Sequence, residues 1–121
     1  MQWHPKGPVF AFGSVDGSVW VYHAQKVEKN MSFFGHTESV SVGSFSFDGK
    51  YLITASEDCS SKIWDLKNQC IIYTIKGKKY HQAPISSLAI GKTKNIFATG
   101  SIENEIAVAN YDNSNVIIVI K

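Results

Sequence analysis

Short runs of β-branched and aromatic residues, separated by glycine, serine and aspartate, form the main pattern along the chain. Over residues 40–47, valine or phenylalanine alternates with serine or glycine, which predicts a half-buried strand, and Asp48-Gly49-Lys50 then predicts a tight turn. Residues 51–56 are more continuously apolar and predict a buried strand. No segment shows the 3.6-residue period of an amphipathic helix. The pattern therefore predicts an all-β fold.

Similar strands and turns are predicted along the whole chain, with no linker or low-complexity segment between them. Trp3-His4-Pro5 reads as the end of an inner strand whose beginning is missing. The other predicted strands cover residues 9–13, 18–22, 30–34, 40–47, 51–56, 61–65, 70–75, 85–90, 96–101, 106–110 and 116–120.

A repeated four-residue word organises these strands. Gly13-Ser14-Val15-Asp16, Ala55-Ser56-Glu57-Asp58 and Gly100-Ser101-Ile102-Glu103 follow one another at distances of 42 and 45 residues. A period of about 40 to 45 residues is typical of one four-stranded propeller blade. We therefore predict a single partial β-propeller domain over residues 1–121, with an incomplete blade at 1–34 and further blades at 35–76 and 77–121.

The middle unit carries the most informative motif. Gly35-His36 stands at its start and Trp64-Asp65 at the end of its third strand, so the chain resembles the WD-repeat family. In that family a histidine, a strand Ser or Thr, a turn aspartate and the tryptophan form a hydrogen-bonded set. The resemblance places His36, Ser56, Asp58 and Trp64 in this structural role.

Such a hydrogen-bonded set is also expected on chemical grounds, because a buried indole and a buried imidazole each need a hydrogen-bond partner. Ser, His and Asp are also the members of a nucleophilic triad. A catalytic serine is exposed beside an oxyanion hole, whereas Ser56 lies within an apolar strand. We therefore assign no catalytic residue, and the enzyme remains the third functional class considered.

The outer units carry degraded versions of the set. The first keeps Ser14 and Asp16 but has Tyr22 and His23 in the Trp-Asp positions. The third keeps His81 and Ser101, while its acidic, aromatic and final positions hold Glu103, Ala109 and Asn110. We expect the third unit to lack the hydrogen-bonded network.

Composition narrows the function classes. The formal charge of +2 comes from 12 basic and 10 acidic side chains that form no basic block. This distribution disfavours direct nucleic-acid binding. We interpret the lysines at positions 76, 78 and 79 as part of a solvated loop. Two cysteines build no disulfide framework and no zinc site, so we predict no metal, no cofactor and a reducing compartment. The longest apolar run, Val116–Ile120, is too short to span a bilayer. We expect a soluble cytoplasmic protein, with the nucleus as a second location.

Several short sequence segments carry a more specific family resemblance. The chain resembles an internal part of the angio-associated migratory cell protein family, whose yeast relative is a dedicated chaperone of a large-subunit ribosomal protein. The resemblance implies capture of a basic ribosomal-protein segment by an acidic face, although this chain is slightly basic overall. The segments that carry this resemblance are residues 2–9, 16–22, 63–67 and 76–84.

Propeller loops at one end of the ring usually carry function. The loops that lead into each blade, and the turns between second and third strands, supply our candidate partner-binding residues Glu38, Ser39, Glu57, Gln82 and Glu103. The favoured function is a protein-interaction scaffold of the ribosomal-chaperone kind. The alternative is a generic adaptor in signalling, trafficking or cell migration.

Three blades cannot close a ring, and an open set leaves apolar blade faces without neighbours. We therefore expect either a homo-oligomer that closes the propeller or a longer polypeptide that contains this chain.

Overall fold

The structure is a computed structural model of the 121-residue chain. It describes residues 2–3, 9–23, 31–46, 48–68, 70–76, 80–91, 95–111 and 116–120.

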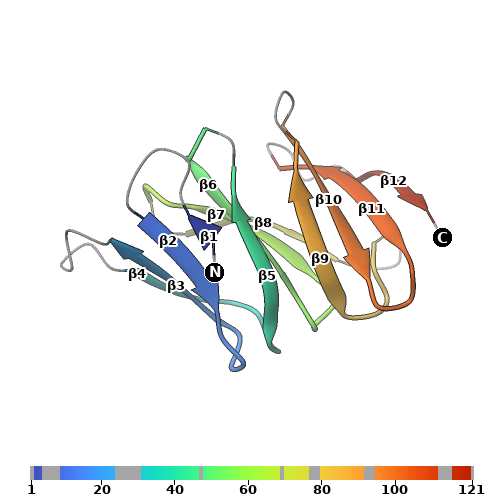
Figure 1. The fold of residues 1–121 in the computed structure, drawn as a ribbon, viewed down its shortest axis with the longest axis horizontal. Coiled ribbons are helices and arrows are strands. Elements are labelled where there is room, and N and C mark those ends of the chain that lie inside the picture. Colours follow the sequence, from blue (N-terminus) through green and yellow to red (C-terminus); the bar gives the residue numbers. More distant parts are fainter. Residues whose placement is uncertain are drawn as a thin grey trace.

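The described residues form three antiparallel sheets, each built from four strands that are consecutive in the chain. The sheets stand side by side, with the second between the other two (Figure 1). Blade 1 contains β1 (Gln2–Trp3), β2 (Val9–Gly13), β3 (Ser18–His23) and β4 (Met31–Phe34). Blade 2 contains β5 (Val40–Phe45), β6 (Tyr51–Ser56), β7 (Ser61–Asp65) and β8 (Cys70–Ile75). Blade 3 contains β9 (Ile85–Ile90), β10 (Ile96–Ser101), β11 (Ile106–Asn110) and β12 (Val116–Ile120).

The predicted all-β architecture of about three four-stranded blades is confirmed. Most predicted strand limits agree with the structure, because alternating side chains and turn residues are strong local signals. The strand predicted to reach Phe47 ends at Phe45. Some predicted strand limits lie outside the described residues: the start of the fourth strand at Asn30, the end of the fifth strand at Phe47, and the His4-Pro5 pair at the end of the first.

The two complete inner strands share an irregularity near their start. In β5 the register shifts between Val40 and Val42, and in β9 the shift falls between the partners of Gly100 and Ser101. The hydroxyl of Ser41, the residue left over in β5, donates to the carbonyl of Ile85 and so ties blade 2 to blade 3. Such bulges re-aim the chain at a strand end.

The core lies between the blades rather than inside one sheet. One cluster joins blades 1 and 2 and includes Val21, Phe33, Leu52 and Trp64. A second cluster joins blades 2 and 3 and includes Ile53, Ile63, Phe97 and Ala109. Blade 2 therefore buries both of its faces.

One turn position has the same backbone geometry in every blade. Gly17, Cys59 and Asn104 each follow the acidic residue of the repeated word and have φ values of 89°, 70° and 64°. This left-handed region favours glycine and tolerates asparagine, whereas cysteine carries a steric cost there. At Gly17 a Cβ atom would also lie 2.2 Å from the carbonyl oxygen of His36, so glycine is required.

Candidate functional site

A relay of side-chain hydrogen bonds runs across blade 2. The Trp64 indole Nε1 donates to the Thr54 hydroxyl at 2.8 Å, and the same hydroxyl lies 2.7 Å from His36 Nε2. His36 Nδ1 lies 3.0 Å from Asp58 Oδ2. Strand β7, strand β6, the loop before β5 and the turn after β6 are thereby joined.

The donors in this relay follow from what each group can do. An indole N–H only donates, so Thr54 accepts from it and uses its single proton toward His36 Nε2. The ring proton of a neutral His36 is then on Nδ1, where it is donated to Asp58. Burial lowers the pKa of His36 despite the opposing effect of Asp58, which favours this neutral form.

Asp58 is the terminal acceptor of the relay. Its two oxygens also accept bonds from the backbone N–H of Thr37 at 3.1 Å and of Ser60 at 2.9 Å, and from the Ser60 hydroxyl at 2.5 Å. Burial alone would raise the pKa of Asp58, but the bonds from Ser60, His36 and Thr37 outweigh it and lower the pKa to about 2. The carboxylate is therefore ionised throughout the physiological range.

The structure brings His36, Asp58 and Trp64 together but corrects the prediction for Ser56. The Ser56 hydroxyl donates to the carbonyl oxygens of Ser39 at 2.8 Å and Glu38 at 3.2 Å, and it accepts the Asp58 N–H at 3.1 Å. Ser56 ends β6, where the strand turns toward the loop that precedes β5. Thr54 supplies the hydroxyl of the relay instead. Ser56 is fully buried, and its hydroxyl proton is directed at backbone carbonyl oxygens.

Blade 1 replaces the relay with aromatic packing. Phe12 occupies the position equivalent to Thr54, and its ring stacks on Tyr22 with centroids 5.5 Å apart. A shorter chain of bonds remains, in which the Trp20 indole donates to Ser18 at 2.9 Å and the Ser18 hydroxyl donates to Asp16 at 2.6 Å.

Blade 3 keeps half of the relay, which corrects the expectation that it lacks the network. His81 Nε2 lies 2.7 Å from the Thr99 hydroxyl, and Thr99 is equivalent to Thr54. The Tyr80 hydroxyl, 2.8 Å from Thr99, replaces the indole donor that Ala109 cannot supply. It also lies 2.6 Å from the Ser61 hydroxyl of blade 2. Burial lowers the pKa of His81 despite the opposing charge of Glu105. Within the described residues His81 Nδ1 has no hydrogen-bond partner, and Glu103, which stands at the Asp58 position, is exposed.

A pair of residues is exchanged between blades 2 and 3. In blade 2, a Cβ atom on Gly35 would lie 2.8 Å from Ile71 Cδ1 and 3.1 Å from the Trp64 indole, so glycine leaves room for both side chains. In blade 3 the equivalent positions hold Tyr80 and Ala109, both buried. The large ring thus comes from the interblade loop in one blade and from the third strand in the other.

The five predicted partner-binding residues lie at one end of the blades. Backbone bonds join the loops to the turns there: Glu57 N–H donates to the Ser39 carbonyl at 2.9 Å, and Ile102 N–H donates to the Pro84 carbonyl at 3.0 Å. Glu38, Glu57, Gln82 and Glu103 are exposed, and Ser39 is half-buried. We call this region the acidic end, because its loops and turns hold Asp16, Glu38, Glu57, Asp58, Glu103 and Glu105.

The thiol of Cys59 lies close to several carboxylates of the acidic end. Partial burial is the largest cause that raises the pKa of Cys59, and the negative charges of Asp58, Glu38 and Glu103 raise it further. Carboxylates of blade 2 and of blade 3 therefore lie near the same thiol. Both Cys59 and Cys70 are free thiols.

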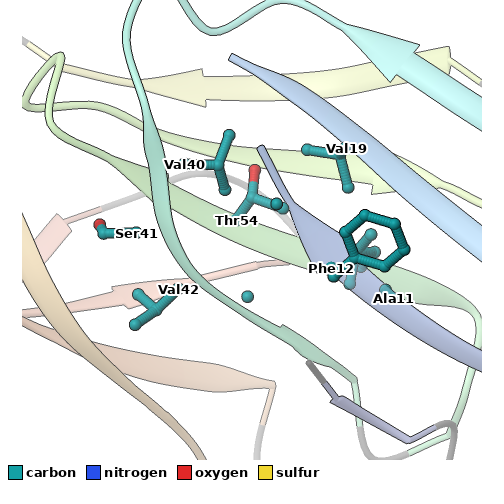
Figure 2. A pocket seen from close by; sticks show the side chains of 10 residues that line it. Ala11, Phe12, Val19, Val40, Ser41, Val42 and Thr54 are labelled. Atoms are coloured by element: carbon teal, nitrogen blue, oxygen red, sulfur yellow. The ribbon is translucent and has the colours of Figure 1, made fainter. Parts of the chain in front are cut away.

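A small cavity of about 110 Å³ lies between blades 1 and 2. Figure 2 shows that Ala11 and Phe12 of β2 lie across it from Val40 of β5. Pockets for drug-sized ligands and cofactors usually measure about 300 to 1,000 Å³. This cavity is a packing gap beside Thr54 rather than a ligand site.

Within the described residues, no three His, Cys, Asp or Glu side chains are grouped so that they could hold a metal ion. The same part of the chain contains no helix with the length and apolar character needed to cross a membrane.

Known proteins resemble both the sequence and the fold. The family model described as "WD domain, G-beta repeat" matches residues 28–65. Angio-associated migratory cell protein of Homo sapiens is 29% identical over 121 residues, and the match covers 100% of this chain and 28% of that protein. The WD repeat-containing protein 55 homolog of Dictyostelium discoideum is 30% identical over 119 residues, covering 97% of this chain and 28% of that protein.

A solved structure supports the fold. A chain in "Crystal Structure of Mitotic Checkpoint Complex" superposes with a TM-score of 0.85 at 20% identity, over 98% of this chain and 38% of that one. The chain spans less than a third of the length of the curated relatives it matches. With the Gly35-His36 and Trp64-Asp65 pairs and three consecutive four-stranded sheets, the chain belongs to the WD-repeat family and forms three blades of a β-propeller.

Proposed function

We propose that the chain is a non-enzymatic protein-interaction scaffold whose acidic end captures a basic segment of a ribosomal protein, as a chaperone in large-subunit assembly. The similarity to angio-associated migratory cell protein supports this choice among WD-repeat functions. We place the activity in the cytoplasm, with the nucleus as a second location.

The distribution of charge carries the proposal. Although the chain has a formal charge of +2, six of its ten acidic residues belong to the acidic end. The described loops and turns of that end, residues 14–17, 35–39, 57–60, 80–84 and 102–105, contain no lysine. Lys78 and Lys79, which precede Tyr80, lie outside the described residues. A lysine-rich segment therefore meets a local field opposite in sign to the net charge.

The acidic end is also held in a fixed shape. The Val40 N–H donates to the Ser14 carbonyl at 3.0 Å, which ties blade 1 to blade 2 at this end. The relay through His36 fixes the turn that carries Asp58. A preorganised set of carboxylates loses little conformational entropy when it binds, which favours recognition of an extended basic segment.

The test is a titration of the chain against a fluorescently labelled lysine-rich peptide, followed by anisotropy. Glu38→Lys together with Glu103→Lys reverses two exposed charges of the acidic end, and we expect affinity to fall by roughly tenfold or more. Raising the salt concentration should weaken binding to the unaltered chain and affect the variant less.

The matched control is Asp48→Lys, a charge reversal in the turn between β5 and β6 at the opposite end of blade 2. We expect it to change affinity by less than about twofold. Binding that is absent, or equally weakened by the control, would contradict the ribosomal-chaperone proposal and favour the generic adaptor with another partner.

A further inference from the structure

The turn between the second and third strands has the same backbone bonds in every blade. In blade 3, the Ser101 N–H donates to the Glu105 carbonyl at 3.0 Å, and the Asn104 N–H donates to the Ser101 carbonyl at 3.3 Å. The other two blades make the same pair of bonds at equivalent positions, at distances between 2.9 and 3.2 Å. Side chains at equivalent positions of this turn therefore start from comparable places.

In blades 1 and 2, two side chains of this turn meet as an acceptor and a donor. The Ser18 hydroxyl donates to the Asp16 carboxylate at 2.6 Å, and the Ser60 hydroxyl donates to the Asp58 carboxylate at 2.5 Å. Each serine thus satisfies a carboxylate that stands two residues before it. The carboxylate of the turn is used within its own blade.

Blade 3 has two carboxylates at these two positions. Glu103 stands where the other blades have aspartate, and Glu105 replaces the serine. A carboxylate accepts hydrogen bonds but cannot donate them when it is ionised, and two like charges repel each other. Glu103 is exposed, whereas Glu105 is half-buried and its Oε2 has no partner among the described residues. The substitution therefore leaves the turn with acceptors that lack a donor.

The ring of His81 is directed at the same turn. Only 1% of His81 is exposed, and its Nε2 makes the bond to Thr99 that His36 Nε2 makes to the equivalent threonine of blade 2. In blade 2 this bond directs the other ring nitrogen, Nδ1, at Asp58 and at the Ser60 hydroxyl, 3.3 Å away. The Nδ1 of His81 faces the equivalent positions of blade 3 and has no partner among the described residues.

His81 Nδ1 is free to act as an acceptor. Burial lowers the pKa of His81, and a neutral imidazole has one nitrogen that accepts. The hydroxyls of Tyr80 and Thr99 can each donate or accept, so Thr99 can accept the Nε2 proton and leave Nδ1 bare. The indole of blade 2 only donates, which fixes the opposite arrangement there. The charge of Glu105 opposes the lowering of the His81 pKa, so its carboxylate lies near the ring.

A following blade does not supply the donor to such a turn. Blades 1 and 2 both have a following blade in the structure. Within the described residues, the donors to their turn carboxylates nevertheless belong to the same blade as the carboxylate: Ser14 and Ser18 for Asp16, and His36, Thr37 and Ser60 for Asp58. By this pattern, the donor that blade 3 lacks comes from a bound partner rather than from another blade.

We propose that Glu103, Glu105 and His81 Nδ1 form a subsite for one lysine side chain of the basic segment. Its ammonium donates one bond to each of the three acceptors. An ammonium carries three donors on a compact head, whereas the planar fork of a guanidinium matches a single carboxylate. The turn bonds of Glu103 and Glu105 use backbone groups, so the two side chains can separate to admit the ammonium. This inference rests on the proposed function and names the residues that select lysine.

The experiment compares a labelled lysine-rich peptide with its arginine counterpart by anisotropy, with EDTA present to exclude a metal ion. We expect the unaltered chain to prefer the lysine peptide by about threefold or more. Glu105→Ser recreates the serine of blade 2 and gives the turn its own donor. It should lose about fivefold or more of the affinity for the lysine peptide, together with the preference for lysine.

The matched control is Glu57→Ser, which removes the same charge from an exposed position of the blade 2 turn. It should weaken both peptides equally, by less than about twofold. Glu105→Ser should also unfold at a higher urea concentration than the unaltered chain, so that its weaker binding does not come from a damaged fold. Circular dichroism checks folding, and Glu105→Gln, which keeps the size of the side chain, replaces Glu105→Ser if that variant does not fold.

The position of the ring proton is a second readout. In the complex with the lysine peptide, long-range proton–nitrogen spectra should place the proton of His81 on Nε2, while His36 keeps its proton on Nδ1. A His81 proton on Nδ1 in the complex, an unaltered chain without lysine preference, or equal losses for Glu105→Ser and Glu57→Ser would each overturn the subsite and leave the proposed function standing. A chain that binds neither peptide would overturn both.

Discussion

Thr54 is the single residue on which the blade 2 relay depends, because its hydroxyl accepts from Trp64 and donates to His36. Thr54→Val keeps the shape but leaves a buried indole N–H and a buried imidazole nitrogen without partners. We expect the free energy of unfolding to fall by about 2 to 3 kcal/mol. Urea denaturation followed by tryptophan fluorescence measures this loss.

Thr37→Val is the matched control, since Thr37 is exposed and its recorded bond to Asp58 uses the backbone N–H. It should cost less than about 0.5 kcal/mol. Equal losses for the two variants would mean that the relay adds no stability beyond the packing of its members.

Asp58 makes the stability of blade 2 dependent on pH. Its pKa is lowered in the folded chain to about 2 from 3.8. The stabilisation is therefore complete above pH 4 to 5, and it is lost as pH falls through 3.8 toward 2. We expect a contribution of about 1 kcal/mol after allowing for solvent screening of this partly exposed group.

Urea titrations of the unaltered chain and of Asp58→Asn, repeated between pH 6 and pH 2, isolate this contribution from the other carboxylates. The difference between the two chains should be constant above pH 5 and should shrink below pH 4. A difference that does not change with pH would show that the Asp58 charge has no part in the stability.

At the scale of elements, the exchanged pair links an interblade loop to a third strand. Ala109→Trp alone should overpack against Tyr80 and cost about 1 to 3 kcal/mol. Tyr80→Gly alone should leave a cavity and cost about 3 to 5 kcal/mol. The double variant recreates the Gly35–Trp64 arrangement, and an indole N–H can again donate to Thr99, so we expect its loss to be smaller than the sum by at least about 1 kcal/mol.

A double-mutant cycle by urea denaturation measures this coupling. Ala109→Trp combined with Thr37→Val, a residue in the loop that enters blade 2, serves as the uncoupled comparison. Losses that simply add in the Tyr80 cycle would contradict the exchange.

The strands could be predicted from sequence because a period of two residues and turn chemistry are local signals. The relay could be predicted only in part. Ser56 fits the word Ala55-Ser56-Glu57-Asp58, but its place at the end of β6 turns its hydroxyl toward the Ser39 carbonyl. A usable signal existed, since Thr54 and Thr99 are 45 residues apart, as are His36 and His81. The role of Tyr80 had no local signal, because it depends on packing between a loop and two blades.

At the scale of the whole molecule, the blades differ in how much of their surface is covered. In blade 2, strand β6 is buried from Leu52 to Ser56 and strand β7 from Ser61 to Trp64. Blade 3 is covered by blade 2 on one face, and β12 has exposed isoleucines. Blade 1 is also covered by blade 2 on one face, and its described inner strand pairs with β2 only at Phe10 and Ala11. Resistance to local opening should therefore decrease from blade 2 to blade 3 to blade 1.

Hydrogen exchange detected by mass spectrometry tests this order. We expect amides of β6 and β7 to exchange slowest and those of β2 and β3 to exchange faster than those of β10 and β11. Uniform protection across the blades would contradict the order and indicate one cooperative unit.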